Sequence, residues 1–288
     1  MHELSQRIWS RLKYAALALA LAAGLAGTAD RASAQASTWD KIQSDKVIKV
    51  GVAQAEPWFF KDPATGQWTG IGPSYAAALA EAMGVKLELV EVTWGTAIAA
   101  LQSSKIDVMP LLNITPKRAL TVDYGNAPLA YSGLALLQRD GLNIKTWDQA
   151  NDPALTIAVP HGASEDQFVT AYLSKAKVLR FPSYAEQLTA FQNGNADAVL
   201  LYHPTLAVMH GRVGKGTITI PTPFHIDSSD VAIRREPDKT FRDFLAVADG
   251  YFYNTGKTQE WYEAFLKSRG MDPTGVPGIQ REAWTGVK

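Results

Sequence analysis

The chain has 288 residues, and its 28 lysines and arginines balance 28 aspartates and glutamates. Bulk charge therefore argues against nucleic acid or a membrane surface as the partner. The absence of cysteine excludes disulfides, thiol chemistry and a lipid-attachment cysteine.

The first 34 residues have the composition of a signal peptide. A basic stretch is followed by an apolar run over residues 14–27, and small residues then allow cleavage near Ala34 or Ala36. The apolar run is short for a membrane-spanning helix, which needs about 20 residues. We therefore expect an exported protein, most simply one of the bacterial periplasm, with roughly 250 residues left for one large or two modest domains.

The first part of the mature chain is predicted to alternate strands and helices. A hairpin is expected around a turn sequence at residues 62–66. Predicted strands span 47–53, 86–92 and 106–111, and predicted helices span 73–83 and 94–103. This alternation is typical of an α/β layer built on a mostly parallel sheet.

The segment over residues 106–118 places an arginine at an unusual position. Thr115 is a good N-cap, Pro116 suits the first helical position, and Arg118 then falls in the first turn. A cation there opposes the helix dipole. We infer that an anion is held there by free N–H groups and by the two-pronged guanidinium. The alternative is a surface arginine in a short turn.

A second α/β unit is predicted from residue 155 onward. Strands are expected over 155–159 and 196–201, and helices from residue 164 and over 184–193. Two further amphipathic helices are predicted over 241–254 and 259–268. The last residues, 271–288, are rich in Gly and Pro and are predicted to form a loosely packed tail.

The second unit repeats part of the first. Residues 93–111 align without gaps to residues 183–201. The identical positions are Ala100, Gln102 and Asp107, which match Ala190, Gln192 and Asp197. The repeat indicates two similar lobes, although any helix–turn–strand unit could produce it. Ligands of open α/β sheets bind at the carboxyl ends of strands, so a cleft is expected between the strand ends at 110–113 and 202–204.

Several short segments together resemble the periplasmic solute-binding proteins of polar amino-acid ABC transporters, known as family 3. The similarity spans roughly residues 46–267. The segments that carry it are Ile48-Lys-Val-Gly-Val52, Pro57-Trp-Phe-Phe60, Gly70-Ile-Gly72, Ala100-Leu-Gln-Ser-Ser-Lys-Ile-Asp107, Ile114-Thr-Pro-Lys-Arg118, Tyr131-Ser-Gly133, Asn193-Gly-Asn-Ala-Asp-Ala198 and Trp261-Tyr-Glu-Ala-Phe265.

The resemblance implies a type II-like binding-protein fold, in which two α/β lobes joined by two hinge strands close on a ligand in a central cleft. Lobe one would comprise residues 46–135 plus 232–288, and lobe two residues 136–231. The hinge strands would be 131–138 and 227–234.

The resemblance also implies roles for single residues. Arg118 would grip the carboxylate of the ligand, with Asn113 as an assisting donor and Leu111 at the same strand end. Ser164 would supply a hydroxyl from lobe two, and its alternative role is a capping box with Gln167. Trp58 would replace the aromatic platform of the family, or else pack in the core.

The chain departs from the family where the ligand ammonium is expected. Tyr202 stands in place of the usual aspartate and is followed by His203. Since a buried ammonium without a carboxylate is costly, Glu56, Glu165 or Asp230 would replace the missing acid. Otherwise the ligand is a carboxylate without an α-amino group, which Tyr202 and His203 would contact through neutral hydrogen bonds or stacking.

We expect a monomeric, non-enzymatic binding protein that delivers an amino acid or related small carboxylate to the membrane permease of an ABC importer. No cofactor is expected, and the few histidines lack metal-site spacing. The rivals are a cyclohexadienyl dehydratase-like enzyme acting on prephenate or arogenate, with Glu165 or His203 as general acid, and a ligand-sensing protein that docks on a membrane receptor.

Overall fold

The structure is a computed structural model that describes residues 36–285, so the predicted signal peptide lies outside the described residues. The compact unit described below begins at Thr38. Among the residues that the structure describes, no helix is both long enough and apolar enough to cross a membrane.

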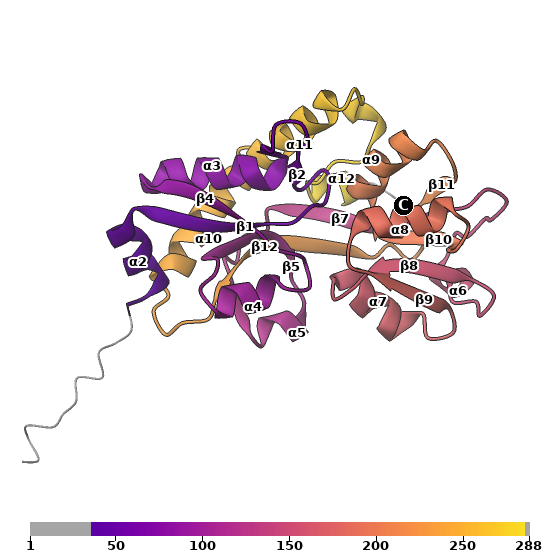
Figure 1. The fold of residues 1–288 in the computed structure, drawn as a ribbon, viewed down its shortest axis with the longest axis horizontal. Coiled ribbons are helices and arrows are strands. Elements are labelled where there is room, and N and C mark those ends of the chain that lie inside the picture. The colour runs from indigo at the N-terminus through magenta and orange to yellow at the C-terminus, as the bar shows by residue number, and fades with distance from the viewer. Residues whose placement is uncertain (1–35, 286–288) are drawn as a thin grey trace, which may run out of the picture. The chain divides into compact units, whose positions relative to one another are not determined.

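The first half of the sheet contains the parallel strands β4, β1 and β5, in that order (Figure 1). Alternate apolar residues of β1 point into the core, where Val50 pairs with Val108 of β5. The elements are α2 Thr38–Asp45, β1 Val47–Val52, α3 Ile71–Met83, β4 Lys86–Glu91, α4 Ala97–Gln102 and β5 Val108–Asn113. The predicted hairpin is confirmed, since β2 (Phe60–Lys61) pairs with β3 (Trp68–Thr69).

The second half contains the parallel strands β10, β8 and β9. Its elements are α6 Trp147–Ala150, β8 Thr156–Pro160, α7 Ser164–Tyr172, β9 Lys177–Phe181, α8 Tyr184–Gln192, β10 Ala198–Tyr202, α9 His203–Val213 and β11 Thr217–Thr219. Parallel strands with helices on both faces form two apolar layers, and each of the two faces here carries its own cluster of buried side chains. The predicted alternation of strands and helices is therefore confirmed in the first half, and in the second half β9 adds a strand that was not predicted between the two expected helices.

Two long antiparallel strands, β7 (Ala130–Gln138) and β12 (Ile226–Arg234), connect the halves (Figure 1). The later part of β7 pairs with β10, and the later part of β12 pairs with β5 and with β6 (Val122–Tyr124). These strands coincide with the two segments expected to act as hinges, and their hinge motion stays a prediction.

The 90-residue repeat is confirmed in the hydrogen bonds of the two halves. Asp107 Oδ2 accepts from the backbone N–H of Lys49 at 2.8 Å, and Asp197 Oδ2 accepts from that of Thr156 at 2.8 Å. Each aspartate thereby ties the turn after a helix to the neighbouring parallel strand. The shared residues therefore reflect a shared local structure rather than a chance similarity.

The C-terminal segment is packed, so the prediction of a loose tail is wrong for the described residues. The segment follows α10 (Thr240–Asn254) and α11 (Lys257–Ser268) and contains the 3-10 helix Pro273–Gly275 and α12 (Glu282–Thr285). Ile279 is fully buried and its carbonyl accepts from the N–H of Tyr131 at 2.7 Å. Trp284 is buried against Gly133 of β7. This segment therefore packs against the rest of the fold despite its many Gly and Pro residues.

Candidate functional site

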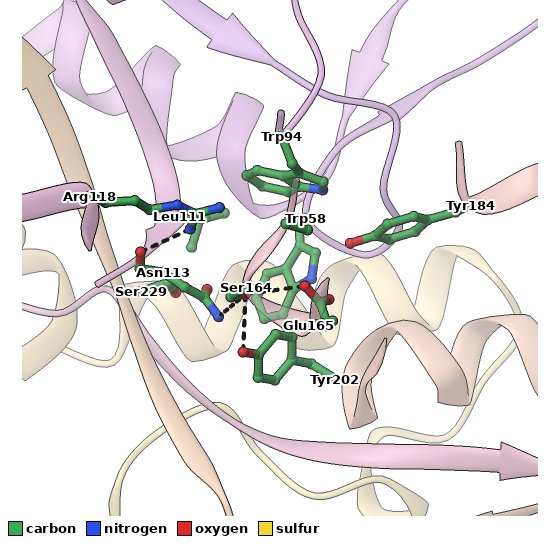
Figure 2. Close-up of a pocket in the computed structure, with 11 residues that line it drawn as sticks. Trp58, Trp94, Leu111, Asn113, Arg118, Ser164, Glu165, Tyr184, Tyr202 and Ser229 are labelled. Carbon is green, nitrogen blue, oxygen red and sulfur yellow. Dashed lines mark hydrogen bonds between the residues drawn. The ribbon is translucent and has the colours of Figure 1, made fainter. Parts of the chain in front are cut away.

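A pocket lies where the strand ends of the two halves meet (Figure 2). Its cavity measures about 20 Å³, which is room for about one water molecule. A ligand of amino-acid size would thus enter only if the halves or their side chains move apart. The lining residues are Trp58, Trp94, Leu111, Asn113 and Arg118 from the first half, Ala163, Ser164, Glu165, Tyr184 and Tyr202 from the second, and Ser229 of β12.

Arg118 is a buried cation without an anionic partner. Its side chain belongs to α5 (Pro116–Ala119), is 4% exposed, and donates through Nη1 to the carbonyl oxygen of Asn113 at 3.0 Å. Within residues 36–285, no carboxylate oxygen lies within 4.0 Å of the guanidinium. A buried charge is costly unless it is paired, so this site has the chemistry to take an anion.

The guanidinium, rather than the helix terminus, provides this anion site. Thr115 caps α5 as predicted, and its hydroxyl accepts from the N–H of Arg118 at 3.2 Å. Pro116 has no N–H, and the helix is only four residues long. The N–H groups that were expected to be free at this terminus are therefore mostly occupied or missing.

The end of β5 has an unusual backbone. Leu111 lines the pocket with a positive φ of 60°, a conformation that costs a residue with a branched side chain of order 1–3 kcal/mol. Two residues later, Asn113 Nδ2 donates to Ser164 Oγ at 3.2 Å, a contact between the two halves. The strand end is thus held in a special geometry where the halves meet.

Ser164 does not cap its helix, so the capping-box alternative is wrong. The N-cap of α7 is Ala163, without a side-chain cap, and Ser164 is the first helical residue. The Ser164 hydroxyl instead donates to Glu165 Oε2 at 3.1 Å and accepts from Asn113 and, at 3.1 Å, from the Tyr202 hydroxyl. It is the junction of the polar network shown in Figure 2.

Tyr202 and Glu165 are further polar residues that the second half contributes to the pocket. The Tyr202 oxygen is also within hydrogen-bonding distance of Asp227 of β12, so its single proton goes either to Asp227 or to Ser164. The other oxygen of Asp227 lies 3.1 Å from Nε2 of His225. Glu165 is 2% exposed, and burial raises the pKa of its carboxyl to about 7. Of the three acids considered as replacements for the missing aspartate, Glu165 is the one that lines this pocket.

Three aromatic side chains complete the wall. Trp58 lines the pocket and also belongs to the apolar core, so both of its expected roles apply. Trp94 and Tyr184 were not predicted as site residues. They occupy corresponding positions of the 90-residue repeat: Trp94 lies three residues before α4, and Tyr184 is the first residue of α8. That correspondence is the sequence signal that could have identified them.

His203 is not a pocket residue, contrary to expectation. It is 2% exposed, its Nδ1 accepts from the N–H of Gly133 at 3.1 Å, and its Nε2 lies 3.0 Å from the carbonyl oxygen of Pro277. The Trp284 ring packs against it edge-on at 4.7 Å. His203 therefore connects α9 with β7 and the C-terminal segment.

Glu56 is also directed elsewhere. Its carboxylate accepts from Arg212 Nη2 at 2.5 and 2.6 Å and from Arg269 Nη2 at 2.8 Å. Both arginines lie outside the pocket lining. Asp230, the third acid considered, is buried beside Asp249 and Gly125 instead. The acid for a ligand ammonium therefore cannot be either of these two residues in this arrangement.

Comparison with known proteins agrees with this geometry. A family model described as bacterial extracellular solute-binding proteins, family 3, matches residues 48–268. A cyclohexadienyl dehydratase of Pseudomonas aeruginosa is 26% identical over 62% of this chain and 70% of its own length. The glutamate/aspartate import solute-binding protein of Escherichia coli is 24% identical over 88% of this chain and 87% of its own length.

A solved structure shares the fold. It is that of an ancestral amino acid-binding protein described as a precursor of cyclohexadienyl dehydratase, with 29% identity, a TM-score of 0.68, and coverage of 81% of this chain and 99% of its own. The predicted two-lobed α/β binding-protein fold is confirmed by such neighbours.

Proposed function

Because the chain belongs to the bacterial extracellular solute-binding proteins, family 3, we propose that it binds an amino acid or related small carboxylate between its two lobes. The loaded protein delivers this ligand to the membrane permease of an ABC importer. It acts in the periplasm and as a monomer. Relatives named for the import of glutamate/aspartate and the binding of L-arginine and L-cystine support a transport role.

The observation that carries this proposal is the buried, unpaired guanidinium of Arg118 in the pocket. A ligand carboxylate would match its two parallel N–H donors, which is the strongest common geometry for such a pair. Asn113 and Ser164 are close enough to each other to share the second carboxylate oxygen as additional donors.

Binding between the lobes requires them to separate and close again. The lobes proposed are residues 46–135 plus 232–288 and residues 136–231, with 131–138 and 227–234 as hinges. Support comes from the pocket lining, which draws on both halves, and from β7 and β12, which connect them. The small cavity fits a closed arrangement that opens to admit the ligand.

The test is a thermal-shift screen of L-amino acids and of matched keto, hydroxy and aromatic acids, followed by calorimetry on the best ligand. Arg118→Ala should weaken binding at least about 30-fold, the scale expected when one partner of a buried charge pair is removed. Lys117→Ala, on the same short helix but exposed, is the matched control and should bind like the wild type. Equal affinity of Arg118→Ala and the wild type would refute the carboxylate assignment.

A second candidate function is dehydratase chemistry. Glu165 is a buried acid in the pocket whose pKa of about 7 suits a general acid, and one relative is a cyclohexadienyl dehydratase. We favour binding, since among the described residues the pocket lining has no histidine, lysine or second carboxyl beside Glu165. Incubation of the wild type with prephenate or arogenate should give no phenylpyruvate or phenylalanine, and their release would overturn the binding-only proposal.

A further inference from the structure

The pocket contains an acidic group that lacks a cationic partner. Within residues 36–285, no lysine, arginine or histidine nitrogen lies within 4.0 Å of the Glu165 carboxyl. Its hydrogen bond from Ser164 is the contact of its side chain shown in Figure 2. Arg118 lines the same pocket and lowers the pKa of Glu165, yet the two side chains do not form an ion pair.

A guanidinium and a carboxyl that line one pocket and do not pair with each other are complementary to the two ends of a zwitterion. We propose that Glu165 forms a second subsite that holds the ammonium group of the ligand, so that the pocket selects amino acids over carboxylates that lack an amino group. This inference rests on the proposed function, because it takes Arg118 as the carboxylate site.

The surroundings of Glu165 fit an ammonium group. Trp58, Trp94 and Tyr184 line the same pocket, and aromatic faces attract cations, most strongly where water is excluded. Tyr202 brings its hydroxyl to Ser164 and so supports the Ser164–Glu165 contact.

A hydrogen-bonded chain links Glu165 to the protein surface. It runs through Ser164 and Tyr202 to Asp227 and ends at His225, whose side chain is 35% exposed. Hydroxyl hydrogens can rotate, so the Ser164 and Tyr202 hydroxyls can each donate toward Glu165 or toward Asp227.

Proton binding at Glu165 gives the two ligand classes opposite pH dependence. Burial raises its pKa most, Asp227 raises it further and Arg118 lowers it. Tyr184 and Tyr202 stay neutral, because burial raises their pKa well above 10. An ammonium needs the carboxylate, so amino-acid affinity should rise with pH up to about 7 and then level off. A carboxylate without an amino group prefers the protonated acid, so its affinity should be level below about pH 7 and fall above it.

The experiment is calorimetry from pH 6 to 8 with four probe pairs: L-arginine, L-glutamate, L-leucine and L-phenylalanine, each against the 2-hydroxy acid with the same side chain. For the wild type we expect at least one amino acid to bind at least about 30-fold more tightly than its hydroxy acid. Glu165→Gln should remove this preference and the rising pH dependence. Glu81→Gln, an exposed glutamate on α3, and His225→Gln should keep the preference.

The outcomes separate the two proposals. In one outcome, the protein binds each amino acid and its matched hydroxy acid equally well, both before and after Glu165→Gln. That result would overturn the ammonium subsite but not the Arg118 site. No binding by any pair, or binding that survives Arg118→Ala, would contradict the proposed function and the subsite together. Proton release by the wild type, measured in two buffers of different ionisation enthalpy, tests the subsite even if Glu165→Gln fails to fold.

Discussion

At the scale of single residues, the sequence predicted the lobe-one side of the pocket better than the lobe-two side. Arg118 and Asn113 follow from a motif in which each residue has a local role. Glu165 lies in the first turn of a helix, where a glutamate is explained by the dipole alone. Its burial depends on packing between the halves, which no local pattern encodes.

His203 is a residue that the sequence suggested for the site but that the fold places elsewhere. The sequence places it beside Tyr202, at the edge where ligands bind, but Gly133 and Pro277 hold its ring inside the fold. Those partners are 70 and 74 positions away in the chain. Adjacency to a site residue was therefore a poor guide, because successive residues after a strand point in different directions.

His203 should make the free energy of unfolding depend on pH. Burial lowers its pKa to about 4 from an ordinary value of 6.5, so the folded state favours the neutral ring. The neutral ring contributes its full stabilisation above pH 6.5. This contribution to the free energy of unfolding, about 3 kcal/mol at most, is lost as the pH falls toward 4. Thermal melts over this range should fall less steeply for His203→Asn than for the wild type. The exposed His161→Asn should match the wild type, and identical slopes for all three would contradict the assignment.

At the scale of elements, most helices and strands were predicted, and the differences are at their ends. α4 begins at Ala97 rather than near Trp94, because the hydroxyls of Thr93 and Thr96 bond to each other's backbone N–H and form a turn first. β5 extends to Asn113 because β12 pairs with it up to that residue. The first effect is local side-chain chemistry, and the second is long-range pairing that the sequence does not show.

α10 packs against β12 through a pair of buried acids. Asp249 and Asp230 are both fully buried, and each has one carboxyl oxygen without a hydrogen-bond partner among the described residues. Asp249 Oδ1 accepts from the Tyr75 hydroxyl at 2.6 Å. Burial raises the pKa of Asp230 to about 7 and that of Asp249 well above its usual value.

Asp249→Asn should therefore stabilise the protein. The folded state binds protons more tightly than the unfolded chain, so the acids cost stability as pH rises from about 4 toward 7. At pH 7.5 the melting temperature of the variant should be a few degrees higher than that of the wild type. For a chain of this size, each kcal/mol of added stability raises the melting temperature by about 2–4 °C. The exposed Asp243→Asn on the same helix is the control. A lower melting temperature than that of the wild type would contradict the prediction that the Asp249 carboxyl costs stability at this pH.

At the scale of the whole molecule, an ion-pair clasp defined by Glu56, Arg212 and Arg269 joins the two halves. Glu56 and Arg269 belong to the first half, whereas Arg212 lies on α9 of the second. Glu56 is 9% exposed and Arg212 is 52% exposed, so solvent and salt screen the pair in part. The clasp can exist only while the halves are close together.

Breaking the clasp should favour the open state. Glu56→Gln and Arg212→Gln are each expected to weaken ligand binding severalfold, more at low salt than at high salt, because exposed ion pairs contribute about 1 kcal/mol or less. Glu91→Gln removes the ion pair with Lys61, which stays within the first half, and serves as the control. The measurement is calorimetry in both salts, and a control variant that weakens binding as much as the clasp variants would count against the clasp.

A crystal structure with the best ligand of the thermal-shift screen will show whether Arg118 holds a small carboxylate between the lobes. We expect the ligand carboxylate about 3 Å from the Arg118 guanidinium nitrogens, with residues of both lobes around it. A ligand bound outside this pocket, or bound in it with its carboxylate away from Arg118, would contradict this assignment.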